Sequence, residues 1–292
     1  MSEDKKILED KFRGCFFGMV LGEMAVPLPG QAPAPSILSP RMSLALYTGE
    51  VLAGRKKDVP FGAFLAGKYL EWSQSGHVGD AVFEEAIQHL KQGESWKKSG
   101  VSSVDSEVLF RATLTGLSEF TQPVDDIKKH ALDSALIIEN DRIALAAAQA
   151  QAFAVAYLIH TEELNILHLM QELIDLTDEV STCFADELRA LVGYMSMDSE
   201  WVLNLIQPKA SALECLPAAL FCFIKSPENF PVTLNACLKG GEGAQIVASL
   251  AGSLSGAYLG AQKIPQELRN RVPEQARING VVNALLEKSI TK

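Results

Sequence analysis

Apolar residues recur at intervals of three and four along almost the whole chain of 292 residues. This spacing places them on one side of an α-helix. It is found in residues 11–24, 41–54, 61–75, 79–92, 104–120, 125–139, 141–160, 163–178, 184–195, 211–224, 229–238, 243–260 and 274–288. No run alternates polar and β-branched residues between turns, so strands are at most a minor element. The sequence therefore predicts an all-α fold, a compact bundle of roughly a dozen helices.

Two of these stretches predict helices in the centre of the fold. Residues 141–160 are apolar nearly all round, with alanines between larger side chains, as in a helix that is buried on most sides. In residues 243–260, small residues recur at every fourth position and form one ridge. A ridge without bulk allows a neighbouring backbone to come close. We therefore predict that Ala248, Gly252 and Gly256 are in close contact with another helix.

Residues 26–40 interrupt the helical pattern. They contain five prolines, Pro27, Pro29, Pro33, Pro35 and Pro40. Proline removes a backbone donor and fixes φ, so this segment predicts an extended loop between the first two helices. It is either an exposed connector or a docking segment for a partner. No second linker is visible, and residues 1–292 are predicted to form a single domain.

Charge, hydropathy and cysteine content restrict the binding partners of the protein and its location in the cell. The chain has 26 Lys and Arg against 36 Asp and Glu, a formal net charge of −10. Nucleic-acid binding needs clustered positive charge, so it is not expected. No stretch of about 20 residues is free of polar interruptions, and no apolar segment follows the charged start, so neither a membrane span nor a signal peptide is predicted. The five cysteines form no CxxC motif, which favours reduced core thiols in a cytoplasmic protein.

Standard catalytic motifs are absent. The sequence contains no HExxH, GxSxG or Walker motif and no zinc-type Cys and His spacing. One glycine turn, formed by Gly240, Gly241, Glu242 and Gly243, directly precedes the small-residue helix. Such a turn either serves as a flexible connection or exposes N–H groups, and the positive end of the helix dipole, to an anionic ligand.

Several segments together resemble one known family. They are residues 12–23 (FRGCFFGMVLGE), 42–46 (MSLAL), 140–157, 216–221 (LPAALF) and 240–252 (GGEGAQIVASLAG). In this order they resemble the ADP-ribosylglycohydrolases. The resemblance implies an all-α orthogonal bundle of helices. Members of that family hold two Mg²⁺ ions between helices and remove ADP-ribose from a modified side chain.

The metal ligands of that family are not retained here. In register with Met42, its early Thr-Asp-Asp motif falls on Ile37, Leu38 and Ser39. Its late Asp-Thr-Asp-Thr motif falls on Glu242, Gly243, Ala244 and Gln245. Leu38 and Ala244 offer no donor, whereas Mg²⁺ requires hard oxygen ligands and usually one or two carboxylates. A register that uses Ser39–Arg41 supplies one hydroxyl and a cation. We therefore expect no metal site and no magnesium cofactor.

The leading functional hypothesis is a non-catalytic relative, or pseudoenzyme. It keeps the scaffold for an adenosine- or ADP-ribose-type ligand or for a protein partner. The candidate ligand-binding residues are Gly240, Gly241, Glu242, Gly243 and Arg111, the last matching a family arginine. Arg111 has the alternative interpretation of an ordinary surface or salt-bridge residue.

The alternative hypothesis is a hydrolase that uses metal-independent acid–base chemistry. Its candidate acids are Glu23, Asp105, Glu107 and Glu242, each of which is otherwise a solvated carboxylate at a helix end. Two or more of them in one concave apolar pocket would favour the enzyme, and their dispersal over the surface would favour the binding protein. A third possibility, self-association, would be supported by an exposed apolar helix face.

Overall fold

The computed structural model describes residues 3–25, 37–56 and 59–291. Its α-helices are α1 (Glu3–Ala25), α2 (Pro40–Ala53), α3 (Phe61–Gln74), α4 (Ala81–Lys91), α5 (Glu107–Glu119), α6 (Val124–Ala135), α7 (Arg142–His160), α8 (Ile166–Asp178), α9 (Thr182–Gly193), α10 (Ser199–Ile206), α11 (Ala212–Lys225), α12 (Phe230–Cys237), α13 (Ala244–Leu259), α14 (Gln266–Arg269) and α15 (Gln275–Ile290). In these residues, β-type pairing is confined to two isolated bridges. The predicted all-α fold is confirmed.

Every stretch with helical spacing coincides with a helix. The short helices α10 and α14 were not predicted. Pro40, assigned to the loop, is instead the first residue of α2, where its missing N–H costs nothing. Ser39 is the N-cap, and its Oγ accepts a hydrogen bond from the Met42 amide at 3.2 Å. The loop prediction for residues 26–36 lies outside the described residues.

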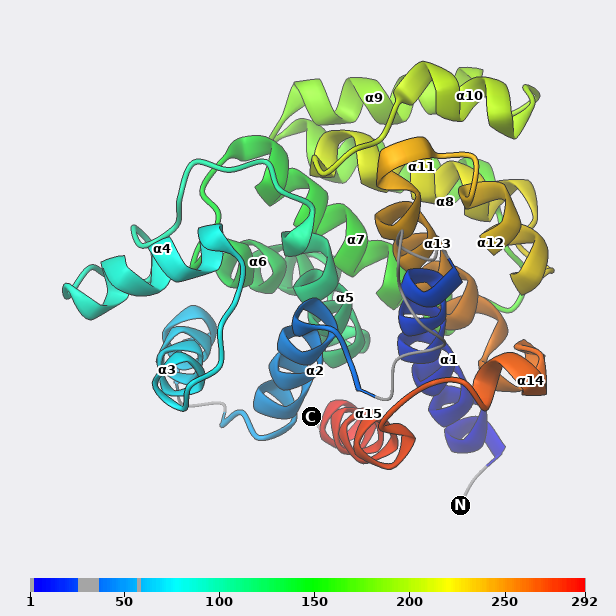
Figure 1. The fold of residues 1–292 in the computed structure, drawn as a ribbon. Helices are drawn as coiled ribbons and strands as arrows, with labels where there is room; N and C mark the ends of the chain where they lie inside the picture. The colour runs from blue at the N-terminus through cyan, green and yellow to red at the C-terminus, as the bar shows by residue number, and fades with distance from the viewer. Residues whose placement is uncertain (1–2, 26–36, 57–58, 292) are drawn as a thin grey trace.

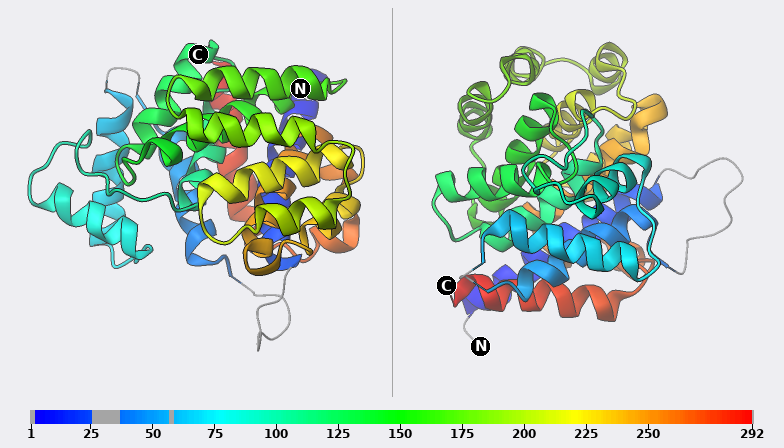
Figure 2. Two further views of the ribbon diagram at one scale, coloured as in Figure 1. Left: turned by 90° about the horizontal axis from the view of Figure 1, so that it is seen from above. Right: turned by 90° about the vertical axis from the view of Figure 1, so that its left-hand side faces the viewer.

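Helix α7 is a central element of the bundle (Figure 1). It packs against α5, α6, α8, α11 and α13. It is the one described helix that is long and apolar enough to cross a membrane, and 83% of its apolar window is buried inside the protein. Burial by neighbouring helices therefore accounts for its composition. The helices α8, α9 and α10 form an outer layer on one side, and α3 and α4 project at another (Figures 1 and 2).

The predicted close contact of the small-residue ridge is confirmed, and its partner is α1. A Cβ atom placed on Gly18 of α1 would lie 2.0 Å from the Gly252 carbonyl oxygen. One placed on Gly256 would lie 1.9 Å from the Gly14 carbonyl oxygen. Because each of these glycines admits the backbone of the other helix, α1 and α13 pack antiparallel with no side chains between their backbones at these points.

The cysteine prediction holds for four of the five residues. Cys15, Cys215, Cys222 and Cys237 are buried, and all are free thiols. Cys183 is exposed near the start of α9, so its assignment to the core was wrong. An apolar neighbourhood in the sequence does not decide which side of an amphipathic helix a residue occupies.

Candidate functional site

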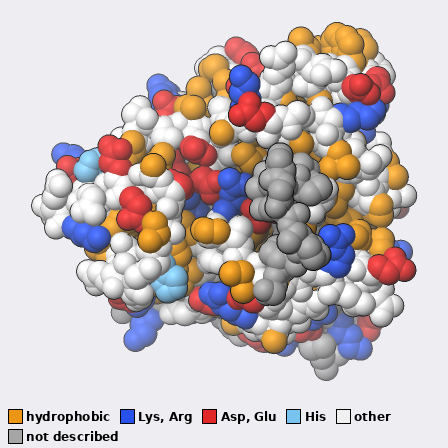
Figure 3. Space-filling model, viewed as in Figure 1, with side chains coloured by type: hydrophobic (Ala, Val, Ile, Leu, Met, Phe, Trp, Pro, Cys, Tyr) orange, Lys and Arg blue, Asp and Glu red, His pale blue; other side chains and the backbone are white. Residues whose placement is uncertain are grey.

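A pocket of about 290 Å³ opens where several helix ends meet. The end of α1, the starts of α2, α5 and α13, and the turn before α4 contribute to it. It is lined by Glu23, Ser39, Pro40, Arg41, Leu44, Gly79, Asp80, Glu107 and Gln245. On the face shown in Figure 3, acidic and basic side chains gather near the middle, beside the residues that are not described. This pocket therefore concentrates charge at a convergence of helix termini.

The guanidinium of Arg41 lies between two carboxylates. Its Nε and Nη2 atoms are 2.6 and 2.5 Å from Glu107 Oε1. Its Nη1 atom is 3.9 Å from Glu23 Oε1. The guanidinium also stacks on the ring of Phe110, 4.7 Å from the ring centre. All three charged side chains are mostly buried. The Arg41 guanidinium is therefore held in one position, with few other side-chain conformations open to it.

The surroundings of Glu23 connect three helices. Ser39 Oγ donates a hydrogen bond to Glu23 Oε1 at 3.0 Å. The side-chain amide of Gln245, on α13, donates to the Glu23 backbone carbonyl at 3.1 Å. Burial raises the pKa of the Glu23 carboxyl, and Ser39 and Arg41 partly oppose that rise. Burial likewise raises the pKa of Glu107, again opposed by Arg41. The pocket thus holds two carboxyl groups that bind protons more readily than free glutamate.

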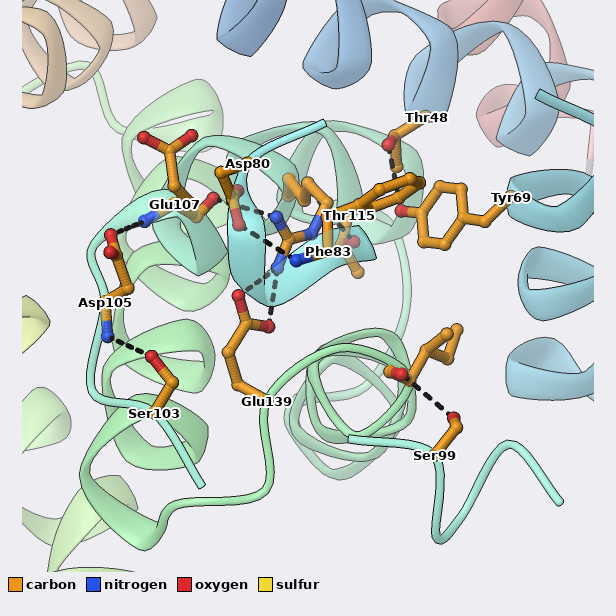
Figure 4. Close-up of polar contacts among 12 residues, drawn as sticks. Thr48, Tyr69, Asp80, Phe83, Ser99, Ser103, Asp105, Glu107, Thr115 and Glu139 are labelled. Carbon is orange, nitrogen blue, oxygen red and sulfur yellow. Dashed lines mark hydrogen bonds and ion pairs between the residues drawn. The ribbon is translucent and has the colours of Figure 1, made fainter. Parts of the chain in front are cut away.

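Arg111 lies beneath the pocket rather than in it. Its Nη2 atom is 2.5 Å from both carboxylate oxygens of Glu139, and only 2% of the Arg111 side chain is exposed (Figure 4). Its Nη1 atom donates to the Glu107 backbone carbonyl at 3.3 Å. The salt-bridge interpretation of Arg111 is confirmed. Its surface location is wrong, and so buried a guanidinium offers no face to a ligand phosphate.

The four candidate acids divide into two groups. Glu23 and Glu107 share the pocket. Asp105 does not line the pocket. Its Oδ1 atom accepts a hydrogen bond from the Glu107 amide at 3.1 Å, near the start of α5. Glu242 is exposed and also lies outside the lining. Two of the four therefore meet the clustering criterion for the enzyme hypothesis, and two do not.

The glycine turn does not line the pocket either. Gly241–Gly243 form a short 3-10 turn before α13. The Gly243 amide donates to the Pro208 carbonyl at 2.9 Å, so this N–H group is already used within the protein. A role of Gly240, Gly241, Glu242 and Gly243 in ligand binding stays a prediction.

Sequence reasoning missed the roles of two charged residues that line the pocket, Arg41 and Asp80. Arg41 was considered only as a misplaced metal ligand, and Asp80 was not considered. Asp80 Oδ1 accepts the Phe83 amide at 2.9 Å as the N-cap of α4. An aspartate before an apolar run is a recognisable N-cap signal. That local signal identifies the start of the helix but not the pocket beside it.

The comparisons with known proteins agree with the fold and the motifs. A family model described as ADP-ribosylglycohydrolase matches residues 4–292. The chain belongs to the ADP-ribosylglycohydrolase family. An uncharacterized protein of Archaeoglobus fulgidus is 20% identical over 285 residues, covering 86% of this chain and 88% of that protein. The ADP-ribosylhydrolase ARH3 of Bos taurus is 24% identical over 215 residues, covering 63% of this chain and 56% of that protein.

A solved structure shares the fold of this ADP-ribosylglycohydrolase family member. It is described as an ADP-ribosylglycohydrolase-related protein complex, and its TM-score is 0.73 at 19% identity. The match covers 99% of this chain and 100% of that chain. At this identity the likeness concerns the fold, and the chemistry of the site has to be judged from the residues present here.

The expected loss of the magnesium pair stays a prediction, and the residues at the corresponding positions bear on it. Leu38, at an early ligand position of the ADP-ribosylglycohydrolases, is buried, and its amide donates to Glu274 Oε1 at 3.0 Å. Ala244, at a late ligand position, is also buried and carries no donor. Within residues 3–25, 37–56 and 59–291, no group of three or more His, Cys, Asp or Glu side chains is placed to hold a metal ion. Arg41 puts a fixed positive charge between the two carboxylates that remain.

Proposed function

We propose that this member of the ADP-ribosylglycohydrolase family is a binding protein that does not hydrolyse ADP-ribosyl bonds. One observation carries the proposal: the Arg41 guanidinium lies between Glu23 and Glu107 in the pocket. Catalysis by metal ions requires an ion that orients and activates water. Here a side-chain cation already lies between the two carboxylates that such an ion would need.

Electrostatic repulsion between Arg41 and a metal ion supports the proposal. Two unit charges 4 Å apart interact by about 4 kcal/mol near a protein surface, and a divalent ion doubles that value. A Mg²⁺ ion beside Glu23 and Glu107 would meet this repulsion from Arg41. To avoid it, Arg41 would have to leave its ion pair with Glu107 and its stacking on Phe110. Either route makes metal binding weaker than it would be in the same pocket without this guanidinium.

The charge of the pocket also restricts its ligand. Three carboxylates, those of Glu23, Asp80 and Glu107, stand against the single guanidinium of Arg41. Carboxylates accept hydrogen bonds from hydroxyl and amine groups and repel phosphates. Among adenosine- and ADP-ribose-type ligands, this favours the nucleoside part over the pyrophosphate. A protein partner, a cytoplasmic location and the absence of nucleic-acid binding stay predictions.

The decisive experiment measures release of ADP-ribose. Purified protein is incubated with proteins ADP-ribosylated on arginine or serine, in 10 mM Mg²⁺ or in EDTA. We expect release at the background rate in both conditions. In parallel, calorimetry with adenosine and ADP-ribose should show the tighter binding for adenosine, and Glu107→Gln should weaken it. Release that EDTA abolishes would overturn the proposal, because it would require a working metal site.

A second function is supported by one observation. Glu23 and Glu107 share the pocket, and burial raises the pKa of both, as metal-independent acid–base hydrolysis would need. This hypothesis expects release of ADP-ribose that EDTA leaves intact and that Glu23→Gln and Glu107→Gln each abolish. It ranks second because Arg41 engages both carboxylates and so competes for the lone pairs that a base would use.

Self-association has a separate structural basis. In α10, Trp201 and Leu205 are about half exposed, at 51% and 50%. Helix α10 belongs to the outer layer of helices (Figure 1), and neither residue lines the pocket. An apolar surface of this kind is compatible with a second copy of the chain, and size-exclusion chromatography with light scattering would detect it. Self-association stays a prediction beside the proposed binding function.

A further inference from the structure

Arg41 joins three segments that are far apart in the sequence. It is the second residue of α2, Glu23 lies near the end of α1, and Glu107 is the first residue of α5. The two contacts of Arg41 with Glu107 Oε1, at 2.6 and 2.5 Å, come from adjacent nitrogens of one guanidinium. Stacking on Phe110 fixes the plane of the group. The position of this charge is therefore determined by the fold as a whole.

The carboxylates around Arg41 need a cation. Glu107 Oε1 receives two donors from Arg41, and Glu23 Oε1 receives Ser39 Oγ in addition to the Arg41 charge. Asp80 lines the same pocket and adds a third negative charge. Without Arg41, these carboxylates would face one another in a mostly buried space, and the nearest guanidinium, that of Arg111, is already paired with Glu139. Mutual repulsion would then favour uptake of a positive ion.

Two carboxylates are sufficient for a magnesium-type ion. Mg²⁺ in proteins is commonly held by one or two carboxylates, and waters complete its octahedron. Glu23 and Glu107 meet that requirement in number and in chemistry, and the pocket volume of about 290 Å³ leaves space for waters. Compared with a pocket that binds such an ion, this pocket contains one additional group, the Arg41 guanidinium. The obstacle to a metal is therefore the charge of one side chain.

We propose that the Arg41 guanidinium is the resident cation of this pocket, and that removing its charge creates a divalent-cation site with Glu23 and Glu107 as protein ligands. This inference rests on the proposed function in one respect: the natural chain binds no divalent ion in the pocket. It goes further by stating that a neutral side chain at position 41 is enough to let Glu23 and Glu107 hold the ion.

Mn²⁺ provides the probe. Its free aquo ion gives a six-line electron paramagnetic resonance signal that weakens on binding, and calorimetry gives the affinity. The natural chain is compared with Arg41→Gln and with Arg41→Met, whose side chain keeps the packing on Phe110. We expect both neutral variants to bind one Mn²⁺ at least tenfold more tightly than the natural chain does. Addition of Glu107→Gln to either variant should return binding to the natural level.

The chain offers a matched control for charge. Arg277 forms ion pairs with Glu50 and Glu274 at 2.9 and 3.1 Å, away from the pocket lining. Arg277→Gln changes the net charge by the same amount as Arg41→Gln. We expect it to bind Mn²⁺ no better than the natural chain. Arg41→Lys, which keeps a positive charge in the pocket, should also fail to bind.

The outcomes separate this inference from the proposed function. If Arg41→Gln and Arg41→Met bind Mn²⁺ no better than Arg277→Gln, the inference is wrong and the proposed function is untouched. If the natural chain itself binds Mn²⁺ tightly in the pocket, both are wrong. Circular dichroism and thermal melting monitor folding. An ion that takes the place of the guanidinium must stabilise the folded variants. Neutral variants that stay unfolded in 10 mM Mn²⁺ therefore also count against the inference.

Discussion

Glu107 contacts both the charged group of the pocket and the buried ion pair of the core. Its carboxylate binds Arg41 at the pocket, and its backbone carbonyl accepts a hydrogen bond from Arg111 below. Arg111 in turn is held by Glu139, which is fully buried. Arg111 and Glu139 thus form an ion pair away from water. Taking two charges out of water is costly, so each of them depends on the other for compensation.

Removing one partner of the buried pair should be severe. Glu139→Leu or Arg111→Met alone leaves an uncompensated charge or a cavity, and we expect either to lower the free energy of unfolding by about 3–5 kcal/mol. The double variant should recover much of the loss, because an apolar pair of similar volume needs no compensation. Urea unfolding followed by circular dichroism measures these changes.

A surface arginine gives the comparison for this prediction. Arg189 forms ion pairs with Asp178 and Asp186 at 2.6 Å; Arg189 and Asp186 are exposed, and Asp178 is partly exposed. Arg189→Ala should leave the urea midpoint almost unchanged, because exposed ion pairs contribute little. A double variant Arg111→Met with Glu139→Leu that is no more stable than the worse single variant would show that shape, not charge, dominates this position.

Single residues were predictable where their signal is local. Glu23, at the end of the opening motif, and Glu107, where a glycine loop of the family is replaced, were both candidate acids, and the pocket brings the two together. The roles of Arg41 and Asp80 were not predictable in the same way. From the local sequence, Arg41 is recognisable only as a cation and Asp80 only as an N-cap. The place of each in the pocket depends on neighbours 18 or more positions away in the chain. Such convergence is a property of packing and leaves no local pattern.

At the scale of helices, prediction worked because the apolar period marks one face of each helix. That signal needs length. Helix α10 spans only Ser199–Ile206, too short for the period to repeat clearly, and α14 spans Gln266–Arg269. The start of α10 does carry a usable mark, since Asp198 Oδ1 accepts the amides of Glu200 and Trp201. The ridge of α13 was predicted, but its partner was identified only by the structure.

The contact of α1 with α13 should tolerate no added bulk. A Cβ atom on Gly252 would lie 2.2 Å from the Gly18 carbonyl oxygen, which is backbone and has little freedom to move. We expect Gly252→Leu to overpack this contact and to cost about 1–3 kcal/mol or more. Thermal melting of Gly252→Leu and of the milder Gly252→Ala measures the loss, and the larger side chain should lose more.

A glycine in open space serves as the control. Gly67 lies inside α3, and a Cβ atom there would meet nothing within 4 Å. Gly67→Ala should therefore raise stability by about 0.5–1 kcal/mol, since alanine is the better helix former. If Gly252→Ala were as stable as Gly67→Ala, the two helices would have to lie farther apart than the structure shows.

At the scale of the whole molecule, the two ends of the chain share one core. The N-terminal helix α1 packs against α13 and α15 near the C-terminus, and also against the central α7 (Figure 2). Helix α7 then connects α5 and α6 to α8 and α11. If the sequence were divided into two halves, α1 and α7 would each be separated from some of the helices that they pack against. That residues 1–292 form a single domain stays a prediction, and this arrangement is the one it requires.

A single domain should unfold as one cooperative unit. Trp72 on α3 and Trp201 on α10 lie in different parts of the bundle, so they report on separate regions (Figure 1). Two variants are made in which Trp96 is replaced and either Trp72 or Trp201 is the only tryptophan left. Fluorescence should give the same urea midpoint in both, and far-UV circular dichroism should agree. The physical reason is that loss of α3 or of the outer layer exposes the apolar surface of α7 and its neighbours, which removes the support of the other region. A midpoint for Trp201 clearly below that for Trp72, with an unchanged helical remainder, would instead show that the outer layer α8–α10 is an independent unit.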